Sequence, residues 1–377
     1  MTAAVKVKGA QRTGVDWFLL LLKVALISAI CAGLLAFIAQ QIDPGNPFAK
    51  WTHDGNEANR LTGDQYKGLI VTGLSQGAMY GLIALGYSMV YGVLGFINFA
   101  HGEVFMLGAF SGFIASTQLD AAGYWEGSAF IPSVIFTVLL AVLVSTTAAV
   151  IMERVAYRPL RGSPRLIPLI TSIGVSFFIQ EATKLLFGPG AKGYPRPPEW
   201  FSQKYSILTF EIEGSKMIVL FVAAVSMAGL WYFVERTKTG KAMRAVAEDK
   251  EIAALMGIDV NKTIVTTFAV GGAMAGVAGI LWGLLFKSVI ATTGFLPGIK
   301  AFTAAVVGGV GNLGGAMAGG VSLGTAEALA PLMLLEPLGV TGVTQLRDAV
   351  AFTLLILVLL VKPTGLFGER LSSEDRA

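Results

Sequence analysis

Long apolar blocks alternate with short charged stretches along most of the chain. The blocks cover residues 17–39, 68–90, 103–116, 130–152, 166–187, 217–233, 263–286, 301–330 and 349–361. A helix needs about twenty predominantly apolar residues to cross roughly 30 Å of hydrocarbon, and most blocks approach that length. The pattern predicts an all-α fold, a polytopic transmembrane helical bundle.

The block at 301–330 departs from this simple pattern. It is interrupted by Gly308-Gly309-Val310-Gly311-Asn312-Leu313-Gly314-Gly315, a run of poor helix propensity. As a single crossing, the block would leave Lys362, Arg370 and Arg376 on the outer side, against the positive-inside rule. We therefore predict two half-helices that enter and leave on one side, giving about eight full spans plus a re-entrant pair.

Basic residues concentrate before the first block and in two loops. The first loop carries Arg154, Arg158, Arg161 and Arg165, and the second carries Arg236, Lys238, Lys241, Arg244, Lys250 and Lys262. Alternation from a cytoplasmic N-terminus, preceded by Lys6, Lys8 and Arg12, places both loops on the cytoplasmic side. We predict that both termini are cytoplasmic.

Composition narrows the function classes. Of 377 residues, 54% are hydrophobic and only 14% charged, which excludes a water-soluble enzyme. The formal charge of +4 arises in loops without nearby aromatic interleaving, so we predict contact with the lipid bilayer and none with nucleic acid. Cys31 is the single cysteine. Because no nucleophile, base or metal constellation is visible, we predict no catalytic residue, no metal site and no cofactor on this chain.

Polar residues gather among glycines in the second block and just after it. Intramembrane polar groups are costly, about 2.5–3.5 kcal/mol for a charge at mid-depth, and usually face a cavity or partner. Helices broken at glycine expose backbone groups that bind the charged ends of a zwitterion. The candidate substrate-path residues are Gln76, Tyr80, Asn98, His101, Glu103 and, at the predicted glycine turn, Asn312. Alternatively, Asn98, His101 and Glu103 merely cap a helix at the cytoplasmic interface.

The cytoplasmic stretch 237–258 is a second candidate site. Gly240-Lys241 is superficially similar to a phosphate-binding loop, but Glu235 and Ala242 occupy the positions of its first glycine and its Ser or Thr. What remains is a short helix rich in alanine and charge, ended by Gly257. Exposed Ala253, Ala254 and Met256 favour docking into a groove of a soluble partner over a plain solvated loop.

Several segments together resemble the permease subunits of branched-chain amino-acid ABC importers, of the LivH type. The resemblance runs in order from about Gln65 to Gly368. Its segments are Ala84-Leu85-Gly86-Tyr87-Ser88-Met89-Val90-Tyr91-Gly92, Ile97-Asn98-Phe99-Ala100-His101-Gly102-Glu103-Val104, Glu153-Arg154-Val155-Ala156-Tyr157-Arg158-Pro159-Leu160-Arg161, Lys300-Ala301-Phe302-Thr303-Ala304-Ala305-Val306, and Leu360-Val361 with Pro363-Thr364-Gly365. Arg244-Ala245, Ala247-Glu248-Asp249, Leu255 and Gly257-Ile258 belong to it as well.

The resemblance implies an import pore in the bacterial inner membrane. Its partners would be a second homologous permease subunit, two cytoplasmic ATPase subunits that bind the ATP, and a periplasmic substrate-binding protein. An ATPase-coupling segment is implied at Gly240–Gly257. Arg244, Glu248 and Asp249 would supply its polar contacts, while Gly240 opens it and Ala253, Ala254 and Gly257 form its close-packed side.

The same resemblance divides the chain into three parts. Residues 1–66 form an additional N-terminal span and external loop, because typical members begin near Gln65. Residues 67–368 form the permease domain, and residues 369–377 form a cytoplasmic tail. The added span is expected to contact either the second permease or the binding protein.

The predicted function is inward transport of leucine, isoleucine or valine by alternating access. One alternative has the same architecture but imports urea or short-chain amides. An alternative of another class is an ion-coupled secondary transporter, for which Glu181 and Glu327 are the candidate coupling carboxylates.

Overall fold

The computed structural model describes residues 14–42, 63–207, 210–336, 340 and 342–368. The external loop expected between the first span and residue 66 lies mostly outside these residues, and the tail expected at 369–377 lies wholly outside them. The additional N-terminal span is described as helix α1 (Gly14–Ile42).

Long apolar helices dominate the described residues, as the apolar blocks predict. After α1 come α3 (Gly63–Leu94), α4 (His101–Ala121), α5 (Phe130–Met152), α6 (Leu166–Phe187), α8 (Gly214–Arg236), α11 (Val260–Phe286), α12 (Phe295–Gly308), α13 (Leu313–Ala330) and α14 (Arg347–Val361). Within the described part of the chain, 9 helices are long and apolar enough to cross a membrane, and α12 is the shorter apolar helix. The predicted all-α polytopic bundle is confirmed.

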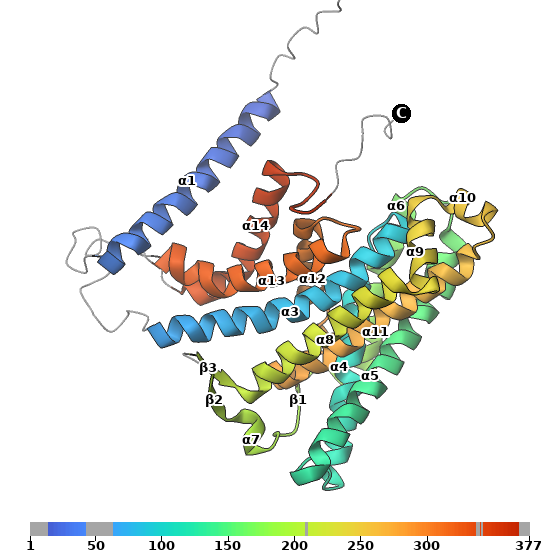
Figure 1. Cartoon of the computed structure of the whole chain (residues 1–377), viewed down its shortest axis with the longest axis horizontal. Helices are drawn as coiled ribbons and strands as arrows, with labels where there is room; N and C mark the ends of the chain where they lie inside the picture. Colours follow the sequence, from blue (N-terminus) through green and yellow to red (C-terminus); the bar gives the residue numbers. More distant parts are fainter. Residues whose placement is uncertain (1–13, 43–62, 208–209, 337–339, 341, 369–377) are drawn as a thin grey trace, which may run out of the picture.

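The two ends of the bundle differ (Figure 1). At one end α5 runs into the π-helical turn η3 (Glu153–Tyr157) and the 3-10 turn η4 (Arg158–Leu160), and α8 is followed by α9 (Lys238–Glu248) and α10 (Lys250–Leu255). Both predicted basic loops meet here, since Arg161 donates a hydrogen bond to Asn261 at the start of α11. We call this the basic end.

Short strands lie between the long helices on the side away from the basic end. Hairpin strands β2 (Lys204–Ile207) and β3 (Phe210–Glu213) pair antiparallel, and β1 (Lys192–Gly193) pairs antiparallel with β4 (Ser288–Val289). A single helical turn, α7 (Glu199–Ser202), precedes β2. Turns η2 (Gly127–Ala129) and η7 (Val343–Leu346) lead into α5 and α14.

The chain breaks between α12 and α13 inside the predicted glycine run. Gly309 and Gly311 adopt φ values of +109° and +90°, which side chains other than glycine rarely tolerate. The second arm is longer than the half-helix expected there, because the π-helical turn η5 (Pro331–Leu335) extends α13 to 23 residues. The arms pack antiparallel, with Gly308 against Gly315.

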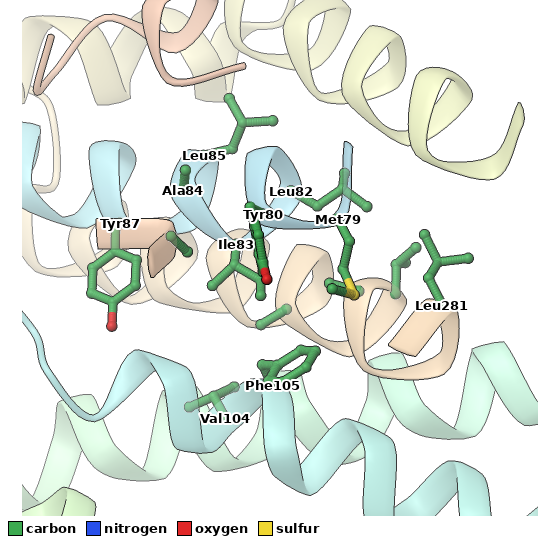
Figure 2. Close-up of a cluster of buried hydrophobic side chains, with 14 of the residues drawn as sticks. Met79, Tyr80, Leu82, Ile83, Ala84, Leu85, Tyr87, Val104, Phe105 and Leu281 are labelled. Atoms are coloured by element: carbon green, nitrogen blue, oxygen red, sulfur yellow. The ribbon is translucent and has the colours of Figure 1, made fainter. Parts of the chain in front are cut away.

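Close packing of α3 on α13 organises the core. A methyl group added at Gly324 would lie only 2.3 Å from the backbone nitrogen and Cα of Gly77. Glycines at this spacing allow such close helix approach. Figure 2 shows buried side chains of α3, among them Met79 and Ile83, packed together with Phe105 of α4.

Helix α1 lies at the edge of the bundle (Figure 1). Gly33 packs so tightly on η5 that an added methyl would lie 2.6 Å from the carbonyl oxygen of Leu334. Phe37 meets Tyr66 edge to face, with ring centroids 5.8 Å apart. Only 6% of its membrane-length window is buried inside the chain, so most of α1 is left to face lipid or another subunit.

Candidate functional sites

The turn between α3 and α4 brings Asn98 into the protein interior. Gly95 leaves α3 with φ +77°, and α4 begins at His101. The Asn98 Oδ1 atom accepts the Ala100 N–H at 3.1 Å and the Tyr157 hydroxyl at 2.6 Å. Asn98 therefore joins the α3–α4 turn to the π-helical turn η3.

His101 and Glu103 are buried and face other helices. The His101 ring stands edge-on to Tyr87 at 4.9 Å, and its Nε2 atom has no hydrogen-bond partner among the described residues. Glu103 accepts hydrogen bonds from Gln180 at 2.7 Å and Ser176 at 3.1 Å, both on α6. Glu103 thus bonds α6 and not the first turn of its own helix, and Ala100 supplies no side-chain cap to α4.

Glycine lets α12 approach the same turn. Methyl groups at Gly102 and Gly294 would lie 2.4 Å from the Gly294 carbonyl oxygen and 2.5 Å from Glu103 Oε2 respectively. Glu103 Oε2 is itself buried with no hydrogen-bond partner among the described residues. The Glu103 carboxylate is thus enclosed by the start of α4, by α6 and by the residues that lead into α12.

Tyr80 lies against a different polar cluster. Its ring is 5.8 Å from Lys300 Nζ, which contacts Glu327 Oε1 at 2.5 Å and Asp348 Oδ1 at 2.6 Å. Lys300 and Glu327 have side chains only 8% and 5% exposed, whereas Asp348 is 48% exposed. Lys300 and Asp348 were not among the predicted site residues, although a lysine directly before the apolar block at 301–330 was a visible signal.

Gln76 and Asn312 complete the predicted path residues. Gln76 is buried on α3, and its Oε1 atom has no hydrogen-bond partner among the described residues. Asn312 caps α13 by accepting the Gly315 N–H at 2.9 Å, while its Nδ2 atom donates to the Phe367 carbonyl at 3.0 Å. Its amide fastens the glycine turn to the segment after α14, so the six predicted residues do not form one cluster.

The predicted coupling segment folds as two helices, α9 and α10, where one short helix was expected. Asp249 ends α9 and caps α10 by accepting the N–H groups of Glu251 and Ile252 at 2.8 and 2.9 Å. Gly240 packs on the backbone of Val234 at the end of α8. Arg244 pairs with Glu235 at 2.8 Å within the chain, while Glu248 is exposed.

The expected close-packed side of this segment is divided. Ala253 is buried within the chain, whereas Ala254 is exposed and Gly257, with φ +83°, borders open space. The largest exposed apolar side chains of the segment are Ile252, Leu255 and Met256, which are 59%, 86% and 78% exposed. We call these three residues the α10 apolar surface. Ile252 and Leu255 were not singled out from the sequence.

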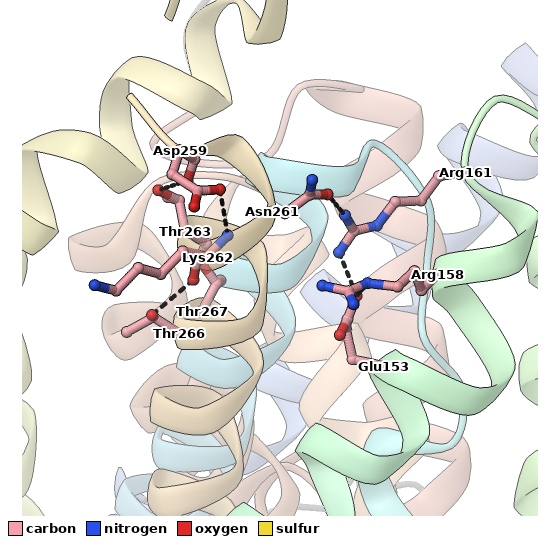
Figure 3. Close-up of polar contacts among 9 residues, drawn as sticks. All are labelled: Glu153, Arg158, Arg161, Asp259, Asn261, Lys262, Thr263, Thr266 and Thr267. Atoms are coloured by element: carbon pink, nitrogen blue, oxygen red, sulfur yellow. Dashed lines mark hydrogen bonds and ion pairs between the residues drawn. The ribbon is translucent and has the colours of Figure 1, made fainter. Parts of the chain in front are cut away.

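A buried carboxylate anchors the basic end (Figure 3). Glu153 is fully buried and pairs with Arg161, while the Arg158 guanidinium lies 3.8 Å away. Arg161 also bonds Asn261 at the start of α11, directly after α10. The cluster ties the end of α5 to the start of α11, the helix that follows the coupling segment.

Metal-binding clusters of three or more His, Cys, Asp or Glu side chains do not occur among the described residues. Long apolar helices, a broken helix pair and buried polar clusters between them define a polytopic membrane protein of the transporter type.

Comparison with known proteins identifies the family. The profile of the family described as "Branched-chain amino acid transport system / permease component" matches residues 69–359, and the chain belongs to this family. It is 43% identical over 303 residues to the high-affinity branched-chain amino acid transport system permease protein BraD of Pseudomonas aeruginosa, covering 80% of this chain and 95% of BraD. It is 40% identical over 299 residues to LivH of Escherichia coli K12, covering 79% of this chain and 94% of LivH.

Proposed function

We propose that this chain is the transmembrane permease subunit of an ATP-driven importer of leucine, isoleucine and valine in a bacterial inner membrane. The observation that carries the proposal is the 43% identity to BraD over 95% of that protein's length. Its partners would be a second homologous permease, two ATPase subunits and a periplasmic substrate-binding protein. The chain itself would be no enzyme and would hold no cofactor, since the ATPase subunits would bind the ATP.

Charge supports the orientation of the proposed subunit. Arg158, Arg161 and Lys250 gather at the basic end, which the positive-inside rule assigns to the cytoplasm. The segment that follows α14 is held to the glycine turn by the hydrogen bond from Asn312 to the Phe367 carbonyl. We therefore assign this C-terminal segment to the cytoplasmic side as well. The basic residues Lys6, Lys8 and Arg12 favour the same side for the N-terminus.

The α10 apolar surface supports contact with a soluble partner. Ile252, Leu255 and Met256 project from a short helix beyond the membrane-spanning part of α8 and α11. An exposed apolar cluster outside the membrane typically marks an interaction site. In the proposed importer the α10 apolar surface docks into a groove of an ATPase subunit. ATP hydrolysis would then move the start of α11, and the contacts from Asn261 to Arg161 and from Arg161 to Glu153 would pass this movement to the end of α5.

The rival functions find less support. The candidate ion-coupling carboxylate Glu181 is 67% exposed and pairs with Lys184, and Glu327 is already paired with Lys300. Neither resembles a free carboxylate deep in a span. The names of the relatives, BraD and LivH, refer to branched-chain amino acids and favour neither urea nor amides.

Reconstitution tests the proposal. The chain is co-purified with its second permease and both ATPase subunits, placed in proteoliposomes and supplied with the binding protein. We expect leucine uptake that requires ATP, with urea not transported. Uptake by this chain alone, driven by a proton or sodium gradient, would refute it.

A matched pair of variants tests the coupling contact. Leu255→Arg places a charge on the α10 apolar surface without disturbing the chain's own core, since Leu255 is 86% exposed. We expect at least a tenfold loss of ATPase-subunit association and of uptake. Tyr205→Arg, at a 40% exposed position on β2 away from the basic end, serves as the control and should leave ATPase-subunit association unchanged. Equal behaviour of the two variants would remove α10 from the coupling contact.

A further inference from the structure

A hollow of about 390 Å³ lies where α8 ends and α9 begins. It is lined by Trp231, Glu235, Arg236 and Lys241. Three of these residues come from the last two turns of α8 and the fourth from α9. The hollow is therefore part of the basic end but separate from the α10 apolar surface.

The net charge of the hollow is positive. Arg236 and Lys241 are exposed and take part in none of the ion pairs among the described residues. The Glu235 carboxylate, which would otherwise repel an anion, is paired with Arg244 at 2.8 Å. Two cationic side chains thus remain without a counter-charge around a space large enough for a phosphate group.

Exposed aromatic side chains beside the hollow indicate that it lies near a membrane–water boundary. Trp231 and Tyr232 are 50% and 62% exposed, and tryptophan and tyrosine concentrate at membrane–water boundaries. Towards the start of α8, Phe221 and Val225 are 69% and 54% exposed and form an apolar strip along which acyl chains can lie. A ligand with an anionic head and apolar chains matches both regions at once.

A nucleotide-type phosphate loop does not explain the cationic residues. The Gly240 N–H is already bonded to Thr237 Oγ1 at 3.0 Å, and an added methyl at Gly240 would lie 2.2 Å from the Val234 carbonyl oxygen. The Gly240-Lys241 backbone is therefore closed against α8 and does not form a cradle of free N–H groups. Lys241 contributes its side-chain charge to the hollow instead.

We propose that this hollow binds the phosphodiester headgroup of an anionic membrane lipid. Arg236 and Lys241 contact the phosphate, and the indole of Trp231 borders the glycerol region. The acyl chains lie along the exposed strip of α8. The bound lipid connects the first turn of α9 to the bilayer, independently of what the permease transports.

Lipid binding to the purified full chain tests this proposal. Native mass spectrometry in detergent measures retention of added phosphatidylglycerol relative to phosphatidylethanolamine. Wild type should retain phosphatidylglycerol preferentially. Because each basic residue near a membrane surface contributes about 1 kcal/mol, the double variant Arg236→Gln/Lys241→Gln should bind it roughly thirtyfold more weakly. Lys238→Gln removes a neighbouring exposed cation that does not line the hollow, and should weaken binding by at most about fivefold, the effect of one general surface charge of about 1 kcal/mol.

Three outcomes would overturn the assignment. The first is a wild-type chain with no preference between the two lipids, and the second is equal retention by the double variant. The third is displacement of phosphatidylglycerol by millimolar inorganic phosphate, which would make the ligand a soluble phosphate. Matching circular dichroism spectra and size-exclusion profiles of the three proteins keep a folding defect from being mistaken for lost binding.

Discussion

One cluster of charged side chains between the membrane helices is paired across helices. Lys300 of α12 meets Glu327 of α13 and Asp348 of α14, so one cation is shared by three helices. The desolvation cost of such charges is offset only while the partners remain together. The pairing makes the position of α12 depend on α13 and α14.

Replacing Lys300 with methionine should destabilise the chain strongly. The change leaves Glu327, whose side chain is 5% exposed, without its cation. Removing one partner of a buried pair typically costs about 3–5 kcal/mol. Thermal unfolding in detergent measures the effect, and the double variant Lys300→Met/Glu327→Gln should recover part of it.

An exposed lysine provides the control for this substitution. Lys204 pairs with Glu211 at 3.5 Å on the surface, with side chains 66% and 65% exposed. Lys204→Met should therefore change stability by at most about 1 kcal/mol. Equal effects of Lys300→Met and Lys204→Met would show that the buried cluster contributes no special stability.

Replacing Lys250 on α10 should stabilise the chain, in contrast to the replacement of Lys300, and the size of this effect should depend on pH. Burial and the nearby cations Arg161 and Arg165 lower the pKa of Lys250 below its ordinary value. Below that folded-state pKa the charged lysine is disfavoured in the folded chain, so Lys250→Gln should raise the melting temperature at pH 7. Between the folded and unfolded pKa values the unfolded state binds more protons, and wild-type stability rises with pH.

Melting curves of both proteins from pH 7 to about pH 10.4, the ordinary lysine pKa, check this prediction. The difference in melting temperature should shrink as the pH rises, since the lysine loses the charge that Arg161 and Arg165 repel. A constant difference would assign the effect to side-chain shape or to the lost 3.4 Å hydrogen bond from Lys250 to the Leu94 carbonyl.

At the scale of elements, the close approach of α3 and α13 depends on missing side chains. Gly77 and Gly81 of α3 face Gly320 and Gly324 of α13 at distances that leave no room for a methyl group at Gly320 or Gly324. In a bilayer, helix association relies on such packing because lipid tails are as apolar as the helices.

Gly324→Val should therefore separate the two helices. The added side chain would overlap the backbone of Gly77, and overpacking typically costs about 1–3 kcal/mol or more. Thermal unfolding in detergent measures the loss. Gly174→Val on α6 is the matched control, since a Cβ there would meet nothing within 4 Å. A comparable loss in the control would point to β-branching in a helix and not to the α3–α13 contact.

Local sequence predicts most membrane helices but few of their contacts. Runs of apolar residues located α5, α6 and α8 nearly to their ends, because span length is fixed by bilayer thickness. The division of the coupling segment at Asp249 was missed, since an Asp cap inside a charged stretch resembles an ordinary helix surface. The contact from Arg161 to Asn261 joins residues 100 positions apart, which no local pattern reveals.

Candidate site residues show the same limit. Asn98, His101 and Glu103 were selected for being polar at the edge of apolar blocks, and all three are buried; their place on a substrate path stays a prediction. Asn312 met the same criterion but caps a helix at the surface of the bundle. Polarity within a span identifies residues that need partners, and only the fold decides whether the partner is backbone, another side chain or a ligand.

At the scale of the whole molecule, the family region and α1 are distinct parts. The family profile begins at residue 69, so α1 lies outside the matched range. Its contact through Gly33 is with η5, which extends the second arm of the broken pair. Any movement of that arm would therefore displace α1 or break its contact at Gly33.

The direction of the broken pair fixes the topology of the C-terminal third of the chain. Helices α12 and α13 pack antiparallel about the turn at Gly309–Asn312, and α13 also packs antiparallel along α3, with Gly320 beside Gly81 and Gly324 beside Gly77. The start of α12 and the segment after η5 should then both face the periplasm, while the glycine turn faces the cytoplasm.

Cysteine labelling in intact cells checks this topology, starting from a Cys31→Ser chain because Cys31 is the single native cysteine. Leu296→Cys and Val340→Cys, at positions 46% and 38% exposed, should both react with a membrane-impermeant maleimide added outside. Val310→Cys, in the glycine turn, should react only after the membrane is opened. Labelling of Leu296→Cys and Val340→Cys from opposite sides would make 301–330 a single crossing and would place the C-terminus in the periplasm.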